Sequence, residues 1–243
     1  MTQDGDGQGR VALVTGGAKA MGRAIALALA PQVSAVAVHY RGSAKEASET
    51  VAGIERLGRR AAAFGADLTE ESRAADLVRS VEEAFGRLDV LINNVGPFLV
   101  KPWLELTRED WDAMLKSVLE SAYFCMKAAL PGMRKRGWGR VINIGYGRIE
   151  RLGSFPTILP YAVAKTGLLV LTRTAAVSEV ANGITVNMVS PGLIEGGILP
   201  AGKIPLSSIG TIADVARAVA YLASDEASAV SGANLPVAGT WKM

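Results

Sequence analysis

The chain of 243 residues is short of the residues that carry several kinds of catalysis, since it holds one cysteine and one histidine. A single cysteine, Cys125, cannot form a disulfide within the chain, which favours a reducing compartment, and we expect the cytoplasm. The histidine, His39, has no cysteine and no second histidine near it in the sequence. We therefore expect no metal site, no Ser-His-Asp triad and no catalytic thiol.

Long apolar runs and long runs of one charge are also missing. The apolar stretches are too short or too interrupted to span a bilayer. Residues 1–9 are polar and Gly-rich and lack the apolar core of a signal peptide, so we expect a flexible tail there. The net charge is +3, and the densest basic cluster, RKR at 134–136, suits the solvated C-terminal turn of a helix. We expect neither a membrane nor a nucleic acid as a partner.

What the sequence does contain is an alternation of short apolar runs with longer helical patterns. The expected strands cover residues 11–15, 33–40, 60–68, 88–94, 140–145, 184–189 and 234–239. The expected helices cover residues 21–30, 43–57, 70–85, 107–133, 160–181 and 212–223. Apolar strands that alternate with helices predict an α/β fold, in which a parallel sheet is covered on both faces. We expect a single Rossmann-type domain over residues 10–243, with a doubly wound, mostly seven-stranded sheet.

Residues 193–210 interrupt the alternation with a stretch that is rich in glycine and proline. This stretch follows the end of an expected strand, where sites in α/β sheets lie. We predict a mobile lid beside such a site, and a plain loop is the alternative.

The stretch TGGAKAMG, residues 15–22, follows the first expected strand and opens the first expected helix. Small residues let the backbone turn tightly and approach a pyrophosphate, and the helix N-terminus supplies N–H groups and positive dipole. A tight turn without a ligand is the other interpretation. We predict a dinucleotide site that includes Gly16, Lys19, Ala20, Met21 and Gly22.

The end of the second expected strand indicates which dinucleotide binds. A cofactor with a free ribose 2′-hydroxyl usually meets an acidic residue there, but this chain reads HYRGS, from His39 to Ser43. The guanidinium of Arg41 can pair with a 2′-phosphate, and Lys19 can add a second charge. Two solvated bases are the alternative. We predict NADP(H), with Arg41 and Ser43 among its contacts.

Two stretches read Tyr-x-x-x-Lys: YAVAK, from Tyr161 to Lys165, and YFCMK, from Tyr123 to Lys127. Residues four apart share one face of a helix, so either pair could place a phenol beside an ammonium group. Spacing alone therefore does not tell which pair transfers a proton.

The motifs taken in order resemble those of the short-chain dehydrogenase/reductase family, over about residues 10–240. TGGAKAMG is similar to the family's TGxxx[AG]xG, NNVG at 93–96 to its NNAG, and YAVAK to its YxxxK. Asp67 and Leu68 match a pair that follows the third strand, and SPG with Ile194 matches a later segment. Within the family, the chain resembles members that act as 3-oxoacyl-carrier-protein reductases and members that act as pteridine reductases.

The resemblance implies roles for these residues. Tyr161 would donate a proton, and Lys165 would bind the nicotinamide ribose and lower the pKa of Tyr161. Tyr123 precedes the fifth strand, where the family has no catalytic residue, so we interpret Tyr123 as a core aromatic and Lys127 as helix surface. Asp67 and Leu68 would contact the adenine. The remaining cofactor contacts would be Asn94, Val95, Gly96, Ile144, Pro191, Gly192 and Ile194.

The chain departs from the family pattern at three positions. The serine that polarises a substrate carbonyl is replaced by Tyr146, although Ser154 is nearer to Tyr161 in sequence. An asparagine of the long helix aligns with Val118, and a threonine of the later segment aligns with Gly196. Tyr146, Ser154 or no group at all could therefore replace the serine.

Three functions follow from these departures. Tyr146 could replace the serine in an ordinary ketone or 3-oxoacyl thioester reductase. A substrate with a C=N bond needs less polarisation, and we favour this reading slightly because VHYRGSAKEA is similar to the second-strand region of pteridine reductases. A protein that binds NADPH without catalysis is the third possibility, and the intact Tyr161 and Lys165 argue against it.

We expect an aromatic, apolar substrate pocket, which suits a ring-bearing molecule. A packing role is the alternative for each of its members, and Arg148 is expected to be solvated. Family members are commonly homotetramers, so we expect a tetramer or dimer. The expected pocket residues are Phe98, Trp103, Tyr146, Ser154, Phe155, Ile158 and Glu195.

Overall fold

The computed structural model of the protein describes residues 9–147, 149–151, 153–195 and 209–239. The expected tail at 1–9, apart from its last residue, and most of the expected lid at 193–210 lie outside these residues. Arg148 and Gly196 lie outside them as well.

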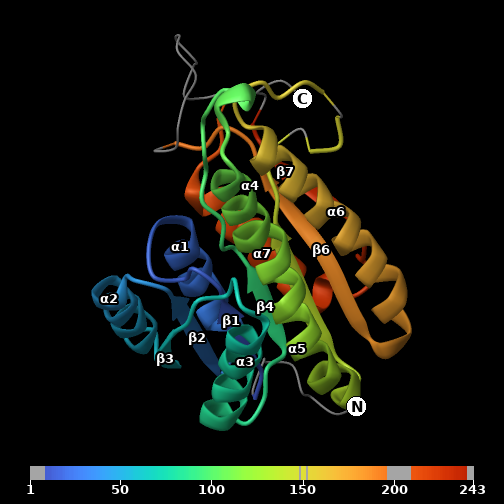
Figure 1. Ribbon diagram of the computed structural model, residues 1–243. Coiled ribbons are helices and arrows are strands. Elements are labelled where there is room, and N and C mark those ends of the chain that lie inside the picture. Colours follow the sequence, from blue (N-terminus) through green and yellow to red (C-terminus); the bar gives the residue numbers. More distant parts are fainter. Residues whose placement is uncertain (1–8, 148, 152, 196–208, 240–243) are drawn as a thin grey trace.

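Seven parallel strands form one sheet in the order β3-β2-β1-β4-β5-β6-β7 (Figure 1). The predicted α/β fold with a doubly wound, seven-stranded parallel sheet is therefore confirmed. The chain starts at a central strand, builds outward to β3, and then crosses back to build from β4 to β7. The strands are β1 (Val11–Val14), β2 (Ala35–Tyr40), β3 (Arg60–Gly65), β4 (Val90–Asn93), β5 (Gly139–Ile144), β6 (Ile184–Pro191) and β7 (Asn234–Val237).

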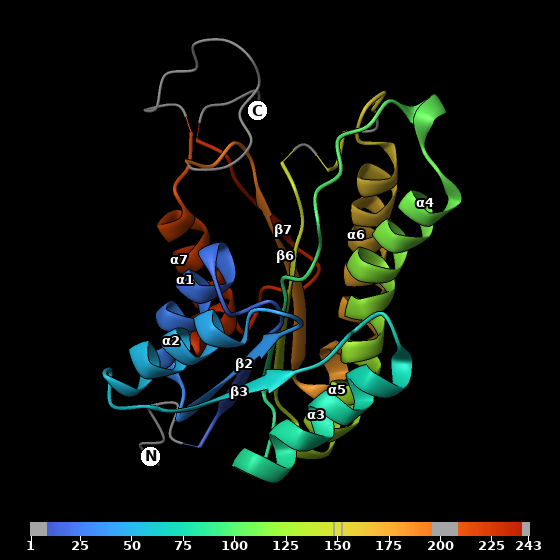
Figure 2. The same cartoon turned by 60° about the vertical axis from the view of Figure 1, so that its left-hand side comes forward.

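Helices cover both faces of the sheet, as Figure 2 shows. The core on one face packs the sheet against α1 (Ala20–Leu29), α2 (Ala44–Glu55) and α7 (Ile212–Ala223). The core on the other face packs it against α3 (Glu71–Phe85), α5 (Ser121–Arg136) and α6 (Leu159–Glu179). Strands β1, β4 and β5 are completely buried, which explains their unbroken apolar runs. Short 3₁₀ turns complete the elements: η1 (Ala30–Gln32), η2 (Trp103–Glu105), η4 (Val180–Asn182) and η6 (Asp225–Ala227).

The long helix predicted for residues 107–133 consists of three consecutive segments. It begins as α4 (Arg108–Leu115), where Thr107 and Asp110 form a capping box. A π-helical segment, Lys116–Glu120, follows and leads into α5. The helix ends at Gly137, whose φ of 67° suits glycine, so it continues past the predicted end and through Pro131. Caps and turns thus account for the boundary differences.

The basic cluster at 134–136 forms the last turn of α5, as the sequence predicted, and Arg134 and Lys135 are exposed there. Arg134 forms two hydrogen bonds with the Glu179 carboxylate, at 2.7 and 2.5 Å. Arg136 donates to the buried Asp89 carboxylate at 3.1 Å. Both arginines therefore tie α5 to neighbouring elements. None of the helices in the described part of the chain combines the length and apolarity that a bilayer span requires.

Candidate active site

The predicted cofactor segments meet at the carboxyl edge of the sheet, around β1 and β4. These two strands are neighbours, although the chain builds away from them in opposite directions. Such a reversal leaves a crevice beyond the carboxyl ends of the strands, where open α/β sheets bind ligands. The glycine turn lies between β1 and α1 at this crevice.

The glycine turn is held by neighbouring backbone and side chains. Gly16 has a φ of 62°, and the Asn94 side chain donates to the carbonyls of Thr15 and Gly16 at 3.1 and 3.3 Å. A Cβ at Gly22 would lie 2.0 Å from the Gly16 carbonyl oxygen, so the helix can approach the turn only with glycine there. Ala20, where the family often has glycine, has a φ of 47°.

The start of α1 is available for an anion. Lys19 is the N-cap residue of α1, and its side chain forms no capping hydrogen bond. The backbone N–H groups of a first helical turn have no partner within the helix and favour negative charge. Lys19 and Ala20 are exposed, and Met21 is half-buried. The turn therefore fits the diphosphate of a dinucleotide.

His39 is a residue of this region to which sequence reasoning gave no role. It lies near the end of β2 with 2% of its surface exposed. Its Nδ1 accepts a hydrogen bond from the Gly16 N–H at 3.0 Å, and its Nε2 lies 3.1 Å from the Ala66 carbonyl oxygen. Burial lowers the pKa of His39, against the opposing effects of Ala66 and Asp67. Its position two residues before Arg41 places it near the expected cofactor, but the sequence does not reveal its hydrogen-bond partners.

Arg41 and Asp67 face each other across the ends of β2 and β3. The Arg41 guanidinium is 70% exposed and lies 3.9 Å from the Asp67 carboxylate. Hydrogen bonds from Thr69 are the main reason that the pKa of Asp67 is lowered. Leu68 is buried, and Ser43 caps α2 without a side-chain hydrogen bond to that helix. These residues leave the arginine free to turn toward a ligand.

Tyr161 and Lys165 lie one turn apart in α6. Lys165 is buried, donates to the Ile144 carbonyl, and lies 5.8 Å from the centre of the Tyr161 ring. Burial lowers the pKa of Lys165 to about 8. Burial, and then Tyr146, raises the pKa of Tyr161 above its ordinary value of 10.0. The expected lowering of that pKa by Lys165 is therefore not what the structure shows, because desolvation of the phenol dominates.

Aromatic side chains surround the Tyr161 ring. Phe98 packs edge-on against it with the ring centres 4.9 Å apart, and Tyr146 does so with the ring centres 5.7 Å apart. Phe155 packs on Tyr146 at 6.2 Å. We call Phe98, Tyr146, Phe155 and Tyr161 the aromatic box. The structure thus brings Phe98, Tyr146 and Phe155 together with Tyr161 from three different segments.

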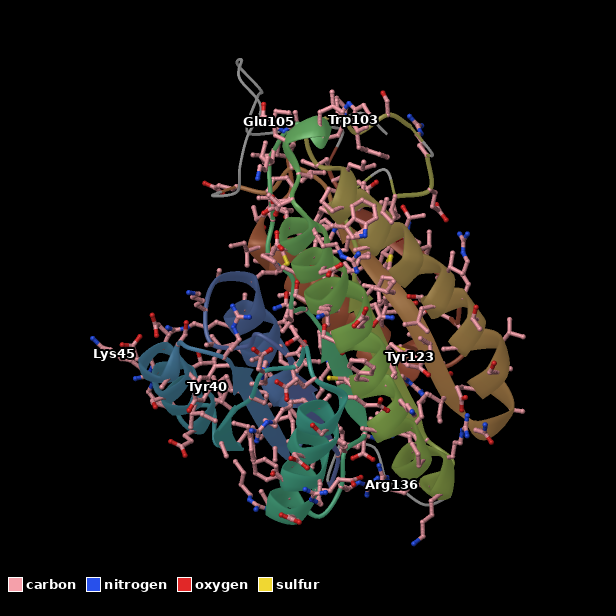
Figure 3. The ribbon with its side chains drawn as sticks, viewed as in Figure 1. Tyr40, Lys45, Trp103, Glu105, Tyr123 and Arg136 are labelled. Atoms are coloured by element: carbon pink, nitrogen blue, oxygen red, sulfur yellow. The ribbon has the colours of Figure 1, made fainter. Side chains whose placement is uncertain are left out.

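The segments that carry the box are joined through their backbones. The Lys101 N–H donates to the Thr157 carbonyl at 2.7 Å, and the Trp103 N–H donates to the Pro156 carbonyl at 2.9 Å. Trp103 itself is 56% exposed, near the top of the molecule in Figure 3, so it does not line the box. Ser154 and Glu195 are also exposed, and Ile158 is half-buried at the start of α6.

The remaining predicted cofactor contacts lie after β4 and at the end of β6. A Cβ at Gly96 would lie 3.0 Å from Val118 and 3.8 Å from the Lys165 ammonium nitrogen, so Val118 closes this side of the lysine. Val95 is half-buried beside Gly96, and Val118 belongs to the π-helical segment. At the end of β6, Pro191 and Ile194 are buried and the Gly192 N–H donates to the Val237 carbonyl at 2.9 Å.

The second Tyr-x-x-x-Lys pair lies on the outside of α5. Tyr123 is 46% exposed, so the interpretation of it as a core aromatic is wrong (Figure 3). Lys127 pairs with Glu71 at 2.6 Å, as helix surface would. Burial raises the pKa of the Cys125 thiol to about 12, which leaves it unreactive. Among the described residues, no three His, Cys, Asp or Glu side chains gather into a metal site.

Comparisons with known proteins agree with this geometry. The family model described as enoyl-(acyl carrier protein) reductase matches residues 16–240. A 3-oxoacyl-[acyl-carrier-protein] reductase of Staphylococcus aureus is 33% identical over 238 residues, which cover 94% of this chain and 96% of the relative. The corresponding reductase of Pseudomonas aeruginosa is 34% identical over 244 residues, which cover 96% of this chain and 97% of the relative.

Solved structures give the same result. A putative short-chain alcohol dehydrogenase of Sinorhizobium meliloti superposes with a TM-score of 0.89 at 34% identity, covering 97% of each chain. A blue fluorescent protein from a metagenomic library, in complex with NADPH, gives 0.87 at 34% identity, covering 97% of this chain and 99% of that one. An NAD⁺-bound xylitol dehydrogenase gives 0.87 at 27% identity, covering 96% and 99%.

Proposed function

Because the chain belongs to the short-chain dehydrogenase/reductase family and is a short-chain oxidoreductase, we propose that it uses NADPH to reduce a small, ring-bearing carbonyl compound, with Tyr161 as the proton donor. One observation carries this proposal. The ring of Tyr161 packs against Phe98 and Tyr146 in the aromatic box, one helical turn from the buried Lys165.

The dinucleotide, when bound, would supply a hydride, that is, a proton together with two electrons, to the substrate carbon. The oxygen of the reduced C=O bond must then gain a proton. Burial keeps the Tyr161 phenol protonated well above neutral pH, so it holds that proton until negative charge develops beside it. Transfer leaves a phenolate, which the positive charge of the Lys165 ammonium group, 5.8 Å from the centre of the Tyr161 ring, would stabilise.

NADPH is favoured over NADH by the charges at the ends of β1 and β2. Arg41 and Lys19 are exposed there, and no acidic residue occupies the end of β2. Asp67 lies near Arg41 and would compete for its guanidinium, but the pair at 3.9 Å is loose and solvated. One similar structure is described as a complex with NADPH and another as bound to NAD⁺, so the preference is a property to measure in this chain.

The aromatic box supports a planar substrate. Phe98 and Tyr146 meet Tyr161 edge to face, and aromatic side chains of this kind also favour contact with a flat, ring-bearing molecule. The 3-oxoacyl-[acyl-carrier-protein] reductases and the short-chain alcohol dehydrogenase are named for reactions of carbon–oxygen bonds, which supports C=O as the reacting group.

A C=N bond is a second candidate because of Tyr146. Its bulky ring packs on Tyr161 at the position where the family has a small serine. A protonated C=N carbon is already electrophilic and needs little help from a hydroxyl donor. Aromatic faces also attract cationic rings, which an iminium substrate would present.

Loss of NADPH absorbance with a panel of substrates tests both candidates. The panel contains ring ketones, cyclic imines, pterins and 3-oxoacyl thioesters. We expect turnover of ring ketones, with cyclic imines or pterins as the second class. Rapid turnover of acyclic ketones or 3-oxoacyl thioesters without any ring compound would overturn the substrate class. NADPH binding with no turnover at all would instead favour a sensor or scaffold.

We also propose that the chain associates with copies of itself through α6. Val163, Val170 and Val177 recur at seven-residue intervals, and they are 40%, 62% and 82% exposed. Tyr123 adds an exposed ring on the neighbouring α5. Exposed apolar stripes of this kind usually mark an interface. Sedimentation of the wild type should show a dimer or tetramer, and Val170→Glu should shift it toward the monomer, whereas an unchanged mass would contradict this interface.

A further inference from the structure

The imidazole of His39 is bonded at both ring nitrogens to backbone groups of two different segments. One partner is the N–H of Gly16, which can only donate, at 3.0 Å from Nδ1. The other is the carbonyl of Ala66, which can only accept, at 3.1 Å from Nε2. Only a neutral ring with its proton on Nε2 satisfies both partners.

The backbone of His39 adds a second attachment to the same turn. Its carbonyl accepts from the Gly17 N–H at 2.9 Å, so two successive amides of the glycine turn are bound to one residue. The opposite side of the turn is held by Asn94. On the other side of the ring, Ala66 is followed by Asp67 and Leu68, the predicted adenine contacts. His39 therefore lies between the two segments that would hold the ends of an adenosine diphosphate.

We propose that His39 is a positioning residue for the dinucleotide, and that its neutral, Nε2-protonated ring holds the glycine turn and the Ala66–Leu68 segment at a fixed separation. The inference rests on the proposed function. Its physical basis is preorganisation. Two loops that are already fixed relative to each other lose less conformational entropy when one ligand spans both.

The surroundings of the ring favour the neutral form. Burial opposes a charge on the imidazole, while the nearby carboxylate of Asp67 favours one, and burial has the larger effect. Asp67 in turn faces Arg41, at 3.9 Å, which weakens its pull on the histidine. An imidazolium would also direct a second N–H at the Gly16 N–H, replacing a hydrogen bond by two opposed donors.

Nitrogen NMR of the ring tests the tautomer in the wild-type protein. His39 is the single histidine of the sequence, so a protein labelled with ¹⁵N-histidine and carrying no histidine tag gives one imidazole. We expect the signature of a neutral ring with a proton on Nε2 and none on Nδ1, at pH 7, both before and after NADPH is added. A proton on Nδ1, an imidazolium, or rapid exchange between tautomers would overturn the inference.

Substitutions test whether the two bonds matter for the cofactor. His39→Leu removes both, and His39→Asn keeps an oxygen that can accept from Gly16 while losing the reach to Ala66. The dissociation constant of NADPH, from fluorescence titration, should rise about tenfold in His39→Leu, since both hydrogen bonds that hold the site are lost. His39→Asn should recover part of this loss. The kcat at saturating NADPH should change less than about threefold, because the phenol is untouched.

Thermal unfolding of each variant separates a positioning role from a structural one. If His39→Leu melts at a lower temperature but its folded form binds NADPH within about twofold of wild type, the residue only supports the fold and the inference fails. The outcome is also distinct from a failure of the proposed function. A wild type that binds NADPH but reduces nothing contradicts the proposed reaction and leaves the role of His39 standing.

Discussion

The two ends of the sheet differ in how many partners their buried charged side chains have. At the amino end, the buried Asp89 carboxylate accepts from Arg87 at 2.7 Å, from Arg136 at 3.1 Å and from the Val11 N–H at 2.9 Å. At the carboxyl end, the buried Lys165 ammonium donates to one backbone carbonyl. Figure 3 places Arg136 at the bottom of the molecule and Trp103 at its top, so the two ends lie far apart.

The amino end pairs its charges repeatedly. Trp138 lies between two guanidiniums, with Arg10 at 3.9 Å and Arg140 at 4.3 Å from its ring centre. Asp225 accepts from Arg10 at 2.8 Å and from the Trp138 indole at 3.2 Å. Such networks stabilise the fold, and their charged groups are occupied by one another.

The carboxyl end instead holds groups whose pKa values are shifted mainly by burial. Desolvation is the main cause for Tyr161, Lys165 and His39, and among the described residues no opposite charge offsets it for Tyr161 or Lys165. Buried titratable groups with shifted pKa values are typical of functional sites. The comparison indicates that paired charges at the amino end stabilise the fold. Buried titratable groups at the carboxyl end lower its stability and are available for reaction.

Removing the buried ammonium group of Lys165 should separate catalytic activity from stability most clearly. We expect Lys165→Met to lower kcat/KM by about a thousandfold, because phenolate and cofactor ribose both lose their partner. The melting temperature at pH 7 should not fall, because an unpaired buried charge is replaced by an apolar chain of similar length. Lys127→Met, in the exposed pair, is the matched control and should keep full activity. A Lys165→Met variant that melts well below wild type would contradict the comparison.

The burial of Lys165 also predicts how the stability difference between the wild type and Lys165→Met depends on pH. The pKa of Lys165 falls from 10.5 to about 8 on folding, so the unfolded chain binds more protons between these values. The free energy of unfolding of the wild type, relative to Lys165→Met, should therefore rise as pH increases through this window and fall as pH decreases. Urea unfolding of both proteins at pH 7, 8, 9 and 10 measures the difference. A constant difference would mean that the lysine is not desolvated.

Breaking the network at the amino end should affect stability alone. Asp89→Asn removes the charge that faces Arg87 and Arg136, and we expect a loss of about 3 kcal/mol in the free energy of unfolding. The kcat of the folded fraction should stay within about twofold of wild type, because the change lies at the far end of the strands. Chemical unfolding and initial rates at a temperature well below the transition check both values. A large loss of kcat with unchanged stability would reverse the assignment of the two ends.

The cofactor preference comes from the carboxyl end and should respond to charge there. Arg41→Ala should raise the dissociation constant of NADPH by about tenfold and that of NADH by less than twofold, because only NADPH carries the 2′-phosphate. Arg59→Ala removes the same charge at the start of β3, where Arg59 donates to the Pro31 carbonyl, and should change neither constant. Equal effects of Arg41→Ala on both cofactors would reject the NADPH assignment.

The smallest effect should come from Arg10, which is partly exposed and contacts Trp138 and Asp225 at the amino end of the sheet. Arg10→Ala loses the ion pair with Asp225 and the contact with Trp138, and we expect about 1 kcal/mol, or roughly 2–4 °C in melting temperature. Calorimetry with a parallel activity assay measures it. Any change in the dissociation constant of NADPH would show that the two ends are coupled, against this account.

Most of the architecture could be predicted from the sequence because it depends on local patterns. Buried parallel strands read as unbroken apolar runs, and the helix over 212–223 has its predicted bounds. The π-helical segment around Val118 could not be predicted, since the surrounding sequence has an ordinary helical pattern and only packing distinguishes it.

Parts of the site could not be predicted because they depend on contacts between distant segments. The sequence proposed Phe98, Tyr146 and Phe155 as pocket walls, and the folded chain brings them to Tyr161. It gave no sign that His39 would bond Gly16 and Ala66, which are 23 and 27 residues away. It also misjudged the pKa of Tyr161, because spacing gives the distance to a charge along a helix but not the degree of burial.

The most direct test of the central claim is the rate of hydride transfer in a single turnover by Tyr161→Phe, with Tyr123→Phe as the matched control. Each variant is mixed with NADPH and a substrate found in the panel, and the absorbance of NADPH is followed by stopped flow. We expect Tyr161→Phe to bind NADPH normally and to transfer hydride at least about a thousandfold more slowly than wild type, while Tyr123→Phe matches wild type. Hydride transfer at the wild-type rate in Tyr161→Phe would contradict the account.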